Sequence, residues 1–192
     1  NNYTNNLTVK KDKLFNLNNK RGKNISNLIK TSSGFSVTYK NEAELIFQEE
    51  EVFKEIFRQI SKAQNHIHLQ FYIIRDDKLG QKLKDLLIKK SQGKVKIRII
   101  YDELGSHALK SNYKKKLKQA GVEIEGYNNF IESILKGKLN HRNHRKLLII
   151  DGKIGFIGDV NIGNEYADGK TRESIMVKVE GEIVRSMQQV FL

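Results

Sequence analysis

The sequence contains no cysteine, no proline and no tryptophan in its 192 residues. Without cysteine, the chain has no disulfide, no thiolate metal site and no cysteine nucleophile, and its sequence does not reveal a redox compartment. The longest apolar runs, such as Phe71 to Ile74 and Leu147 to Ile150, are far too short to span a bilayer. No signal peptide opens the chain, so we expect the chain as it stands to be soluble.

Positive charge, in contrast, is abundant. Lys and Arg number 35 against 22 Asp and Glu, which gives a net charge of +13 and a pI near 9.7. Such a field attracts polyanions and weakens with salt, so nucleic acid and anionic membrane surfaces are both candidate partners. A merely solvated, lysine-rich face explains the charge equally well. The hydrophobic fraction of 38% excludes a wholly disordered chain.

Hydrophobic periodicity predicts strands that alternate with helices. Helical spacing occurs in three segments, at Glu49 to Ala63, Lys78 to Lys90 and Ser111 to Ala120. Strand-like segments lie at His66 to Ile74, Lys94 to Tyr101 and Val122 to Glu125, and this order favours parallel pairing. A hairpin around Asp151-Gly152, a strand from Ser174 to Val179 and a closing helix follow. We therefore predict an α/β domain at residues 41–192, preceded by a partly ordered N-terminal extension at residues 1–40.

Candidate catalytic residues occur at the start of the hairpin, in the pattern His144-x-Lys146-x4-Asp151. Residues two apart on a strand point to the same face, so the tips of His144 and Lys146 can reach one small anion. A neutral imidazole can attack phosphorus to give a phospho-histidine, while the lysine neutralises the oxygens of the phosphate. This chemistry requires no metal and no cofactor.

Other polar residues are placed to support that site. Asn161 follows the second hairpin strand and can return near His144 to donate to the same phosphate, while Glu165 is the best nearby carboxylate to orient the imidazole. Asp151 could do this too, but its hairpin position favours structural hydrogen bonding. Arg142 and Arg145 flank the histidine and could gather an anionic substrate.

These segments together resemble bacterial cardiolipin synthase, a branch of the phospholipase D superfamily. The resemblance is carried by the stretches His68 to Asp77, Tyr101 to Ser106, Asn143 to Gly158, Asn161 to Tyr166 and Gly181 to Val184. It implies a phospholipase D-like α/β/α sandwich with a mixed, mostly parallel sheet. It also implies that His144 is nucleophile or general acid, that Lys146 and Asn161 bind phosphate, and that Asp151 completes the motif.

The implied reaction is phosphatidyl transfer, in which two phosphatidylglycerol molecules yield cardiolipin and glycerol. The family builds one site from two such motifs behind membrane-spanning helices, whereas this sequence matches the first half. The resemblance therefore implies a partner motif, in the rest of the same enzyme or in a second copy of the chain. It also implies a location at the cytoplasmic face of the cell membrane.

The sequence departs from the family at two places. Asp159 stands where Gly or Ser is usual beside the phosphate, and Thr171-Arg-Glu173 replaces the usual Trp-Arg-Asp. Asp159 could repel an anionic substrate unless its carboxylate tilts away. Two rival hypotheses remain open: a metal-independent nuclease formed by two identical chains, and an inactive half that binds lipid or a second chain.

Some polar residues favour structural roles over functional ones. His66 and His68 share a strand face, but no third ligand lies nearby in the sequence, so sheet histidines are favoured over a metal pair. His107 and His141 lie beside polar loops and are expected to be solvated. Asp102 and Ser106 follow a strand, where sites often lie in α/β proteins, yet turn and capping roles are favoured.

Overall fold

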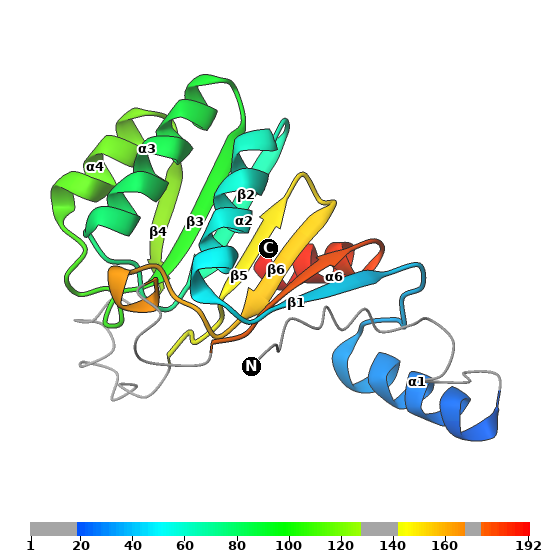
Figure 1. Ribbon diagram of the computed structural model, residues 1–192. Coiled ribbons are helices and arrows are strands. Elements are labelled where there is room, and N and C mark those ends of the chain that lie inside the picture. The colour runs from blue at the N-terminus through cyan, green and yellow to red at the C-terminus, as the bar shows by residue number, and fades with distance from the viewer. Residues whose placement is uncertain (1–18, 128–141, 168–173) are drawn as a thin grey trace, which may run out of the picture.

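The core of the molecule is a seven-stranded sheet with the strand order β1-β7-β6-β5-β2-β3-β4. The computed structural model describes residues 19–127, 142–167 and 174–192. The strands are β1 (Glu42–Ile46), β2 (His66–Phe71), β3 (Lys96–Asp102), β4 (Glu123–Tyr127), β5 (Leu147–Ile150), β6 (Ile154–Gly158) and β7 (Met176–Glu180) (Figure 1).

The sheet is mixed, as the sequence predicts, but its pairing is less parallel than expected. The β2–β3 and β3–β4 pairs are parallel. The β1–β7, β2–β5, β5–β6 and β6–β7 pairs are antiparallel. Because β5 and β7 alone run against the others, most strands still share one direction. The expectation of parallel pairing therefore holds for the β2–β3–β4 half and not for the half built around the hairpin.

Three helices cover one face of the sheet: α2 (Glu49–Lys62), α3 (Lys78–Gln92) and α4 (Ser111–Gln119). The apolar stripe of α2 is buried as its periodicity predicts, with Val52, Ile56 and Ile60 at most 1% exposed. These side chains join the main core, which includes Leu69 of β2 and Leu148 of β5.

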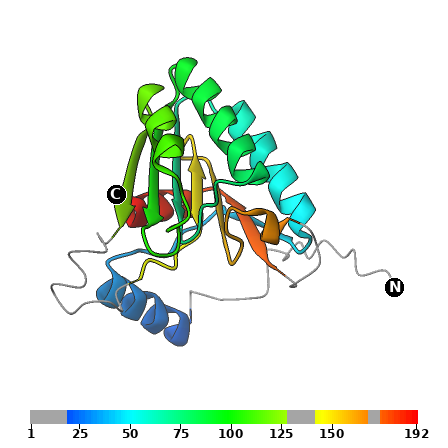
Figure 2. The ribbon, with the colours of Figure 1, turned by 90° about the vertical axis from the view of Figure 1, so that its left-hand side faces the viewer.

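The opposite face is covered by α6 (Ile183–Phe191). Its Val184, Met187 and Phe191 pack against Leu147 and Ile149, the β5 residues that alternate with those of the main core. Helices therefore lie on both faces, which gives the expected α/β/α layering (Figure 2).

Two elements lie near the start of the described chain. Helix α1 (Lys20–Ser33) stands clear of the sheet in both ribbon views (Figures 1 and 2). Strand β1 was not predicted, because Glu42 and Glu44 have low strand propensity and the segment is largely exposed. It forms by pairing along its whole length with β7, at the edge of the sheet.

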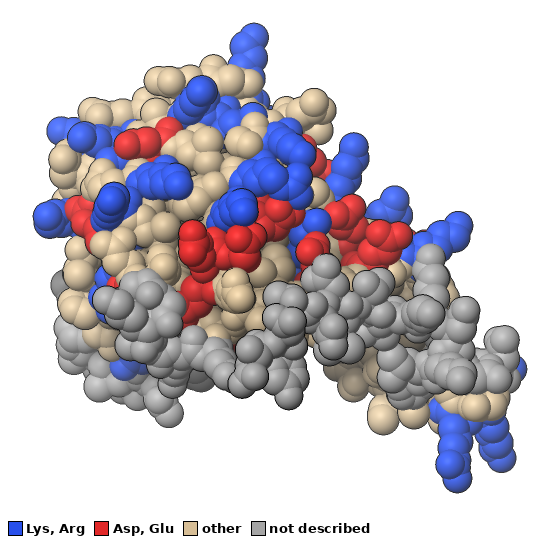
Figure 3. All heavy atoms as spheres, viewed as in Figure 1, with Lys and Arg blue, Asp and Glu red and all other residues tan. Residues whose placement is uncertain are grey.

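Charge is unevenly distributed over the face in Figure 3. Lys and Arg side chains project over α3 and α4 and over α1, while Asp and Glu gather in a band over α2 and β1. Part of this band surrounds Lys178 Nζ, which lies 3.2 Å from Glu55 Oε1 and 3.3 Å from Glu44 Oε2. Partial burial raises the pKa of Glu55, but hydrogen bonds from Arg58, Gln59 and Lys178 outweigh it and lower the pKa to about 2. On this face, positive charge therefore lies mainly away from α2 and β1.

Candidate active site

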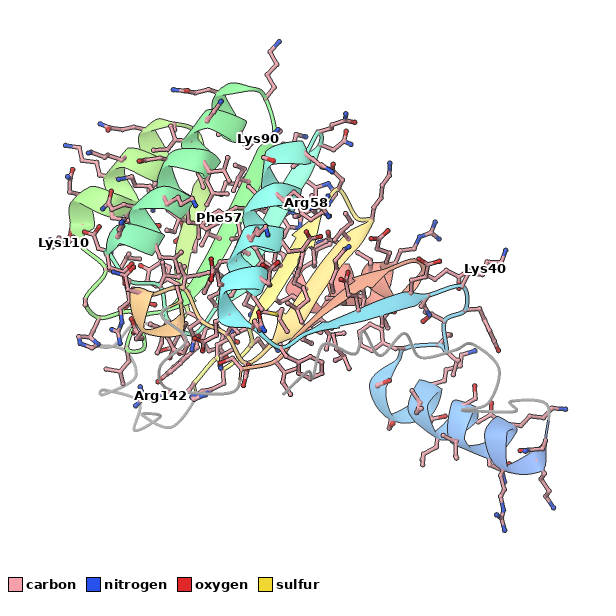
Figure 4. The ribbon with its side chains drawn as sticks, viewed as in Figure 1. Lys40, Phe57, Arg58, Lys90, Lys110 and Arg142 are labelled. Carbon is pink, nitrogen blue, oxygen red and sulfur yellow. The ribbon has the colours of Figure 1, made fainter. Side chains whose placement is uncertain are left out.

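The candidate site lies at one end of the sheet, where β2 ends and β5 begins. Gln70 and Leu147 are paired across these two strands, which places Tyr72 and Lys146 at the same edge. Figure 4 shows Arg142 at this end, while Lys90 lies at the far end of α3. We call this end, where β1, β2, β3, β4 and β6 finish, the catalytic edge.

The imidazole of His144 is exposed and stacks on a tyrosine ring. The ring centroids of His144 and Tyr72 lie 4.0 Å apart, with 19° between the planes. The ammonium of Lys146 lies 5.6 Å from the centroid of the Tyr72 ring and donates a hydrogen bond of 2.8 Å to the carbonyl oxygen of His144. The structure thus brings the imidazole and the ammonium together around one aromatic ring, which limits the orientations of both.

The charge state of Lys146 reflects its surroundings. Partial burial lowers the pKa of the ammonium, and the negative charge of Asp159 acts in the opposite direction. Asp159 Oδ1 accepts a hydrogen bond of 2.8 Å from the backbone N–H of Ile175. The Asp159 carboxylate is therefore anchored to the start of the β7 segment, yet it lies close enough for Lys146 to respond to its charge.

Buried groups beneath the site hold the backbone that carries His144. Asp102 Oδ2 accepts a hydrogen bond of 3.0 Å from the N–H of Asn143, while Asp102 Oδ1 accepts from Leu104 and Gly105. Asp102 is 2% exposed, so these bonds are shielded from water. The turn role favoured for Asp102 is confirmed, and the same carboxylate also fixes the residue just before His144.

Ser106 has a similar supporting position behind Tyr72. Its hydroxyl donates to the Tyr72 carbonyl at 3.1 Å and accepts from the Ile74 N–H at 3.0 Å. The structural role favoured for Ser106 is thereby confirmed. These two hydrogen bonds hold the backbone on both sides of Ile73 and so fix the bend after β2 that includes Tyr72.

Asn161 lies against the same bend. Its Oδ1 accepts from the Ile73 N–H at 3.1 Å, and its Nδ2 donates to the Tyr166 hydroxyl at 3.0 Å. Ile73 follows Tyr72 directly, so these contacts hold Asn161 near the catalytic edge. They agree with the predicted return of Asn161 to this end of the sheet. An amide nitrogen carries two hydrogens, and Tyr166 uses one of them.

Asp151 lies at the other end of β5. Its carboxylate accepts hydrogen bonds of 2.7–2.9 Å from the backbone N–H groups of Gln64, Asn65 and His66. Partial burial raises the pKa of Asp151, but these three donors outweigh it and hold the pKa below its ordinary value. Asp151 and Gly152 have φ angles of 55° and 63°, as the two central residues of a type I′ turn require, and the Lys153 N–H closes this turn on the Ile150 carbonyl oxygen at 3.0 Å. The structural hydrogen bonding that its hairpin position favours is what the structure shows.

The remaining predicted site residues have other contacts. Glu165 Oε1 accepts from Arg75 Nε at 2.9 Å, while the described contacts of His144 are with Tyr72 and Lys146. The Nη1 atom of Arg145 lies 3.5 Å from the Val190 carbonyl oxygen of the α6 segment. The predicted roles of Glu165 and Arg145 stay predictions.

The structural role favoured for His66 and His68 is confirmed. Gln188 Nε2 lies 2.7 Å from His68 Nδ1, Gln188 Oε1 lies 3.2 Å from His66 Nε2, and the His68 ring stacks on Phe191. His107 is exposed, as expected, whereas His141 and residues 171–173 lie outside the described residues. Among the residues that the structure describes, no group of three His, Asp or Glu is placed to hold a metal ion.

Tyr72, on whose ring His144 and Lys146 both lie, is not among the predicted site residues. Its signal was its position, just beyond the carboxyl end of a buried parallel strand, where α/β proteins often place their sites. The stacking partner comes from a segment about seventy residues away, so local sequence offers no indication of it.

Comparison with known proteins shows which family the chain resembles. A family model described as "Cardiolipin synthase, PLD-like domain" matches residues 56–192. The chain is 40% identical over 162 residues to cardiolipin synthase 2 of Bacillus cereus, covering 82% of this chain and 31% of the relative. It is 42% identical over 162 residues to a cardiolipin synthase of Oceanobacillus iheyensis, covering 81% and 33%. The chain thus spans about a third of the length of these relatives.

Solved structures share the fold at low sequence identity. NucT from Helicobacter pylori superposes with a TM-score of 0.62 at 15% identity, over 79% of this chain and 94% of NucT. A phosphatidylserine synthase of Haemophilus influenzae gives a TM-score of 0.63 at 17% identity, over 77% of this chain and 35% of that protein. At such identities the likeness concerns the fold alone.

Proposed function

This chain belongs to the cardiolipin synthase, PLD-like domain family, and we propose that it is one half of a two-motif phosphatidyltransferase. Residues 41–192 are the phospholipase D-like domain in this proposal, and residues 1–40 an N-terminal extension. The partner is a second motif, supplied by the rest of a longer enzyme or by another copy of the chain. Anionic phospholipid, and phosphatidylglycerol in particular, is the substrate.

One observation carries the proposal: an exposed imidazole and a partly buried ammonium meet on the ring of Tyr72 at an open edge. In the proposed reaction, a ring nitrogen of His144 attacks the phosphorus of one phosphatidylglycerol and glycerol leaves. The hydroxyl of a second phosphatidylglycerol then displaces the histidine, giving cardiolipin. The histidine of the partner motif protonates the leaving glycerol and takes the proton of the incoming hydroxyl.

The other residues have supporting roles in this proposal. Lys146 and the second N–H of Asn161 Nδ2 neutralise the phosphate oxygens as charge develops, and Arg142 gathers the anionic headgroup. Asp151 completes the motif by fixing the far end of β5. In this proposal Glu165 orients the imidazole through the oxygen that does not bind Arg75, and the remaining N–H groups of Arg145 help to gather the headgroup.

The proposal includes no cofactor and places the working enzyme at the cytoplasmic face of the cell membrane. No helix in residues 19–127, 142–167 and 174–192 is long and apolar enough to cross a bilayer. In the proposal, attachment to the membrane therefore comes from chain outside this sequence or from contacts at the bilayer surface.

The test is to incubate the chain with phosphatidylglycerol vesicles and chelator, and to measure cardiolipin, glycerol and the intact protein mass. We expect a phosphatidyl adduct on the protein, kept at neutral pH because phospho-histidine is labile in acid. His144→Ala should abolish the adduct and any product. His107→Ala, which removes another exposed histidine, should retain both.

The same experiment separates the rival functions. Absence of both adduct and cardiolipin from the chain alone, with both restored by the missing half, indicates a half-site, because the partner histidine protonates the leaving glycerol. Cleavage of DNA in chelator, lost in His144→Ala, with no lipid adduct, would replace the proposal by the nuclease. If the wild-type chain shows neither lipid transfer nor DNA cleavage, even after addition of the missing half, the chain is the inactive half of the third hypothesis.

A further inference from the structure

Helix α1 exposes an apolar stripe that the other helices bury. Ile25, Leu28 and Ile29 occupy the i, i+3 and i+4 positions of one face and are 40%, 67% and 43% exposed. The apolar stripes of α2, α3, α4 and α6 are buried against the sheet, whereas Gly22 is the one buried residue of α1. A stripe of this size left in water is unfavourable unless something covers it.

The charge of α1 indicates what covers it. The helix carries Lys20, Arg21, Lys23 and Lys30 and has no acidic residue. Lys20, Lys23 and Lys30 lie on the side of the helix opposite the apolar stripe, as 100° steps along the helix show. A helix that is apolar on one side and basic on the other matches the interface of an anionic bilayer, where the stripe enters the acyl boundary and cations meet headgroups.

The catalytic edge shows a similar apolar exposure. Phe47, Ile157 and Ile175 are 45%, 49% and 42% exposed. Phe47 follows the last residue of β1, Ile175 precedes the first residue of β7, and Ile157 is the penultimate residue of β6. The pairs Ile46–Met176 and Gly158–Met176 align these three strand ends beside β5, where His144 lies.

The position of α1 connects the two surfaces. In both ribbon views α1 lies below the sheet, on the side to which the catalytic edge faces (Figures 1 and 2). We propose that α1 and the catalytic edge form one docking surface for an anionic bilayer, with α1 lying in the plane of the interface. This docking surface deepens the proposed function and rests on it, because the proposed reaction requires a lipid headgroup to reach His144. Docking itself can be measured without turnover.

The absence of tryptophan from the chain makes the test direct. Leu28→Trp and Asn27→Trp place single reporters on the apolar and polar sides of α1, and both native residues are exposed. With phosphatidylglycerol vesicles, we expect the emission of Leu28→Trp to shift to shorter wavelength and that of Asn27→Trp to stay unchanged. With phosphatidylcholine vesicles, neither should shift.

A second matched pair tests the catalytic edge. Phe47→Trp and Tyr39→Trp lie beyond opposite ends of β1, and both native aromatics are exposed. We expect a shift with phosphatidylglycerol vesicles for Phe47→Trp and none for Tyr39→Trp. In vesicle sedimentation, Leu28→Gln should weaken binding about tenfold or more, while Asn27→Gln should change it less than about twofold.

The outcomes are distinct. Equal shifts at residues 27 and 28, or no shift at either, would overturn the docking of α1. A shift of Leu28→Trp that depends on protein concentration and not on lipid would assign the stripe to a second copy of the chain. A shift at residue 28 but not at residue 47 would overturn the shared surface. Because these readouts involve no reaction, a loss of docking and a failure of His144 chemistry would be observed separately.

Discussion

The two ends of β5 are built for opposite purposes, although a single motif supplies both. At the hairpin end, Asp151 is held by three backbone donors. At the catalytic edge, the imidazole of His144 is exposed and rests on the face of Tyr72. The five residue-to-residue steps from Lys146 to Asp151 cover about 16 Å in an extended strand, so one phosphate cannot contact both. In the proposed reaction the histidine and lysine act on the phosphate, while the contacts of the aspartate are with the backbone.

The buried residues behind the catalytic edge, Asp102 and Ser106, also have structural contacts. Asp102 and Ser106 bind backbone groups of Asn143, Tyr72 and Ile74 from inside the protein. They fix the chain on either side of the reactive pair and leave the imidazole itself open. An exposed side chain such as that of His144 can therefore have a fixed backbone, because that backbone is anchored by the buried Asp102.

Removing the anchor at the hairpin end should have the largest effect on stability. Asp151→Ala leaves three N–H groups without their acceptor and places alanine at a φ of 55°, so we expect a loss of about 3 kcal/mol. Asp151→Asn keeps an acceptor and tolerates that φ, and should lose about 1 kcal/mol. Urea denaturation measures both.

A His144→Ala variant that is destabilised as much as Asp151→Ala would contradict the different roles assigned to the two ends of β5. We expect His144→Ala to change the free energy of unfolding by less than about 1 kcal/mol, because the ring is exposed. An Asp151→Ala variant with wild-type stability would remove the structural role assigned to the aspartate.

Sequence patterns predicted the elements whose burial is periodic and missed those that depend on distant contacts. The spacing of Val52, Ile56 and Ile60 predicted α2, because their burial follows the helical repeat. Nothing local predicts β1, whose Glu42 and Glu44 become part of a strand only through pairing with β7. In the same way, local spacing places His144 beside Lys146, but their meeting at Tyr72 requires the pairing of β2 with β5.

The histidines near the hairpin end should make stability depend on pH. Burial is the largest cause that lowers the pKa of His68, the charge of His66 adds to it, and the pKa falls from 6.5 to about 4. The unfolded chain then binds more protons than the folded one in this window, so stability falls as pH drops from about 6.5 to 4. We expect this loss to be about 2 kcal/mol.

Replacement of His68 isolates that contribution. His68→Gln removes the titrating ring, so its free energy of unfolding should vary less over the same pH window, as thermal denaturation at several pH values can measure. His107→Gln removes an exposed histidine and should leave the wild-type dependence unchanged. An unaltered pH dependence in His68→Gln would assign the acid sensitivity to other groups.

The smallest expected effect concerns Asp159, whose negative charge acts on Lys146 and opposes an anionic substrate. Asp159→Asn removes the charge but keeps an oxygen that can accept from the Ile175 N–H. Because Asp159 raises the pKa of Lys146, the variant should lower that pKa and leave a stronger positive field at the edge. Binding of inorganic phosphate, measured by calorimetry, should tighten by a factor of about 2 to 5 at low salt and by less at 1 M salt. Tightening that persists at high salt would mean that Asp159 acts through the shape of the site and not through its charge.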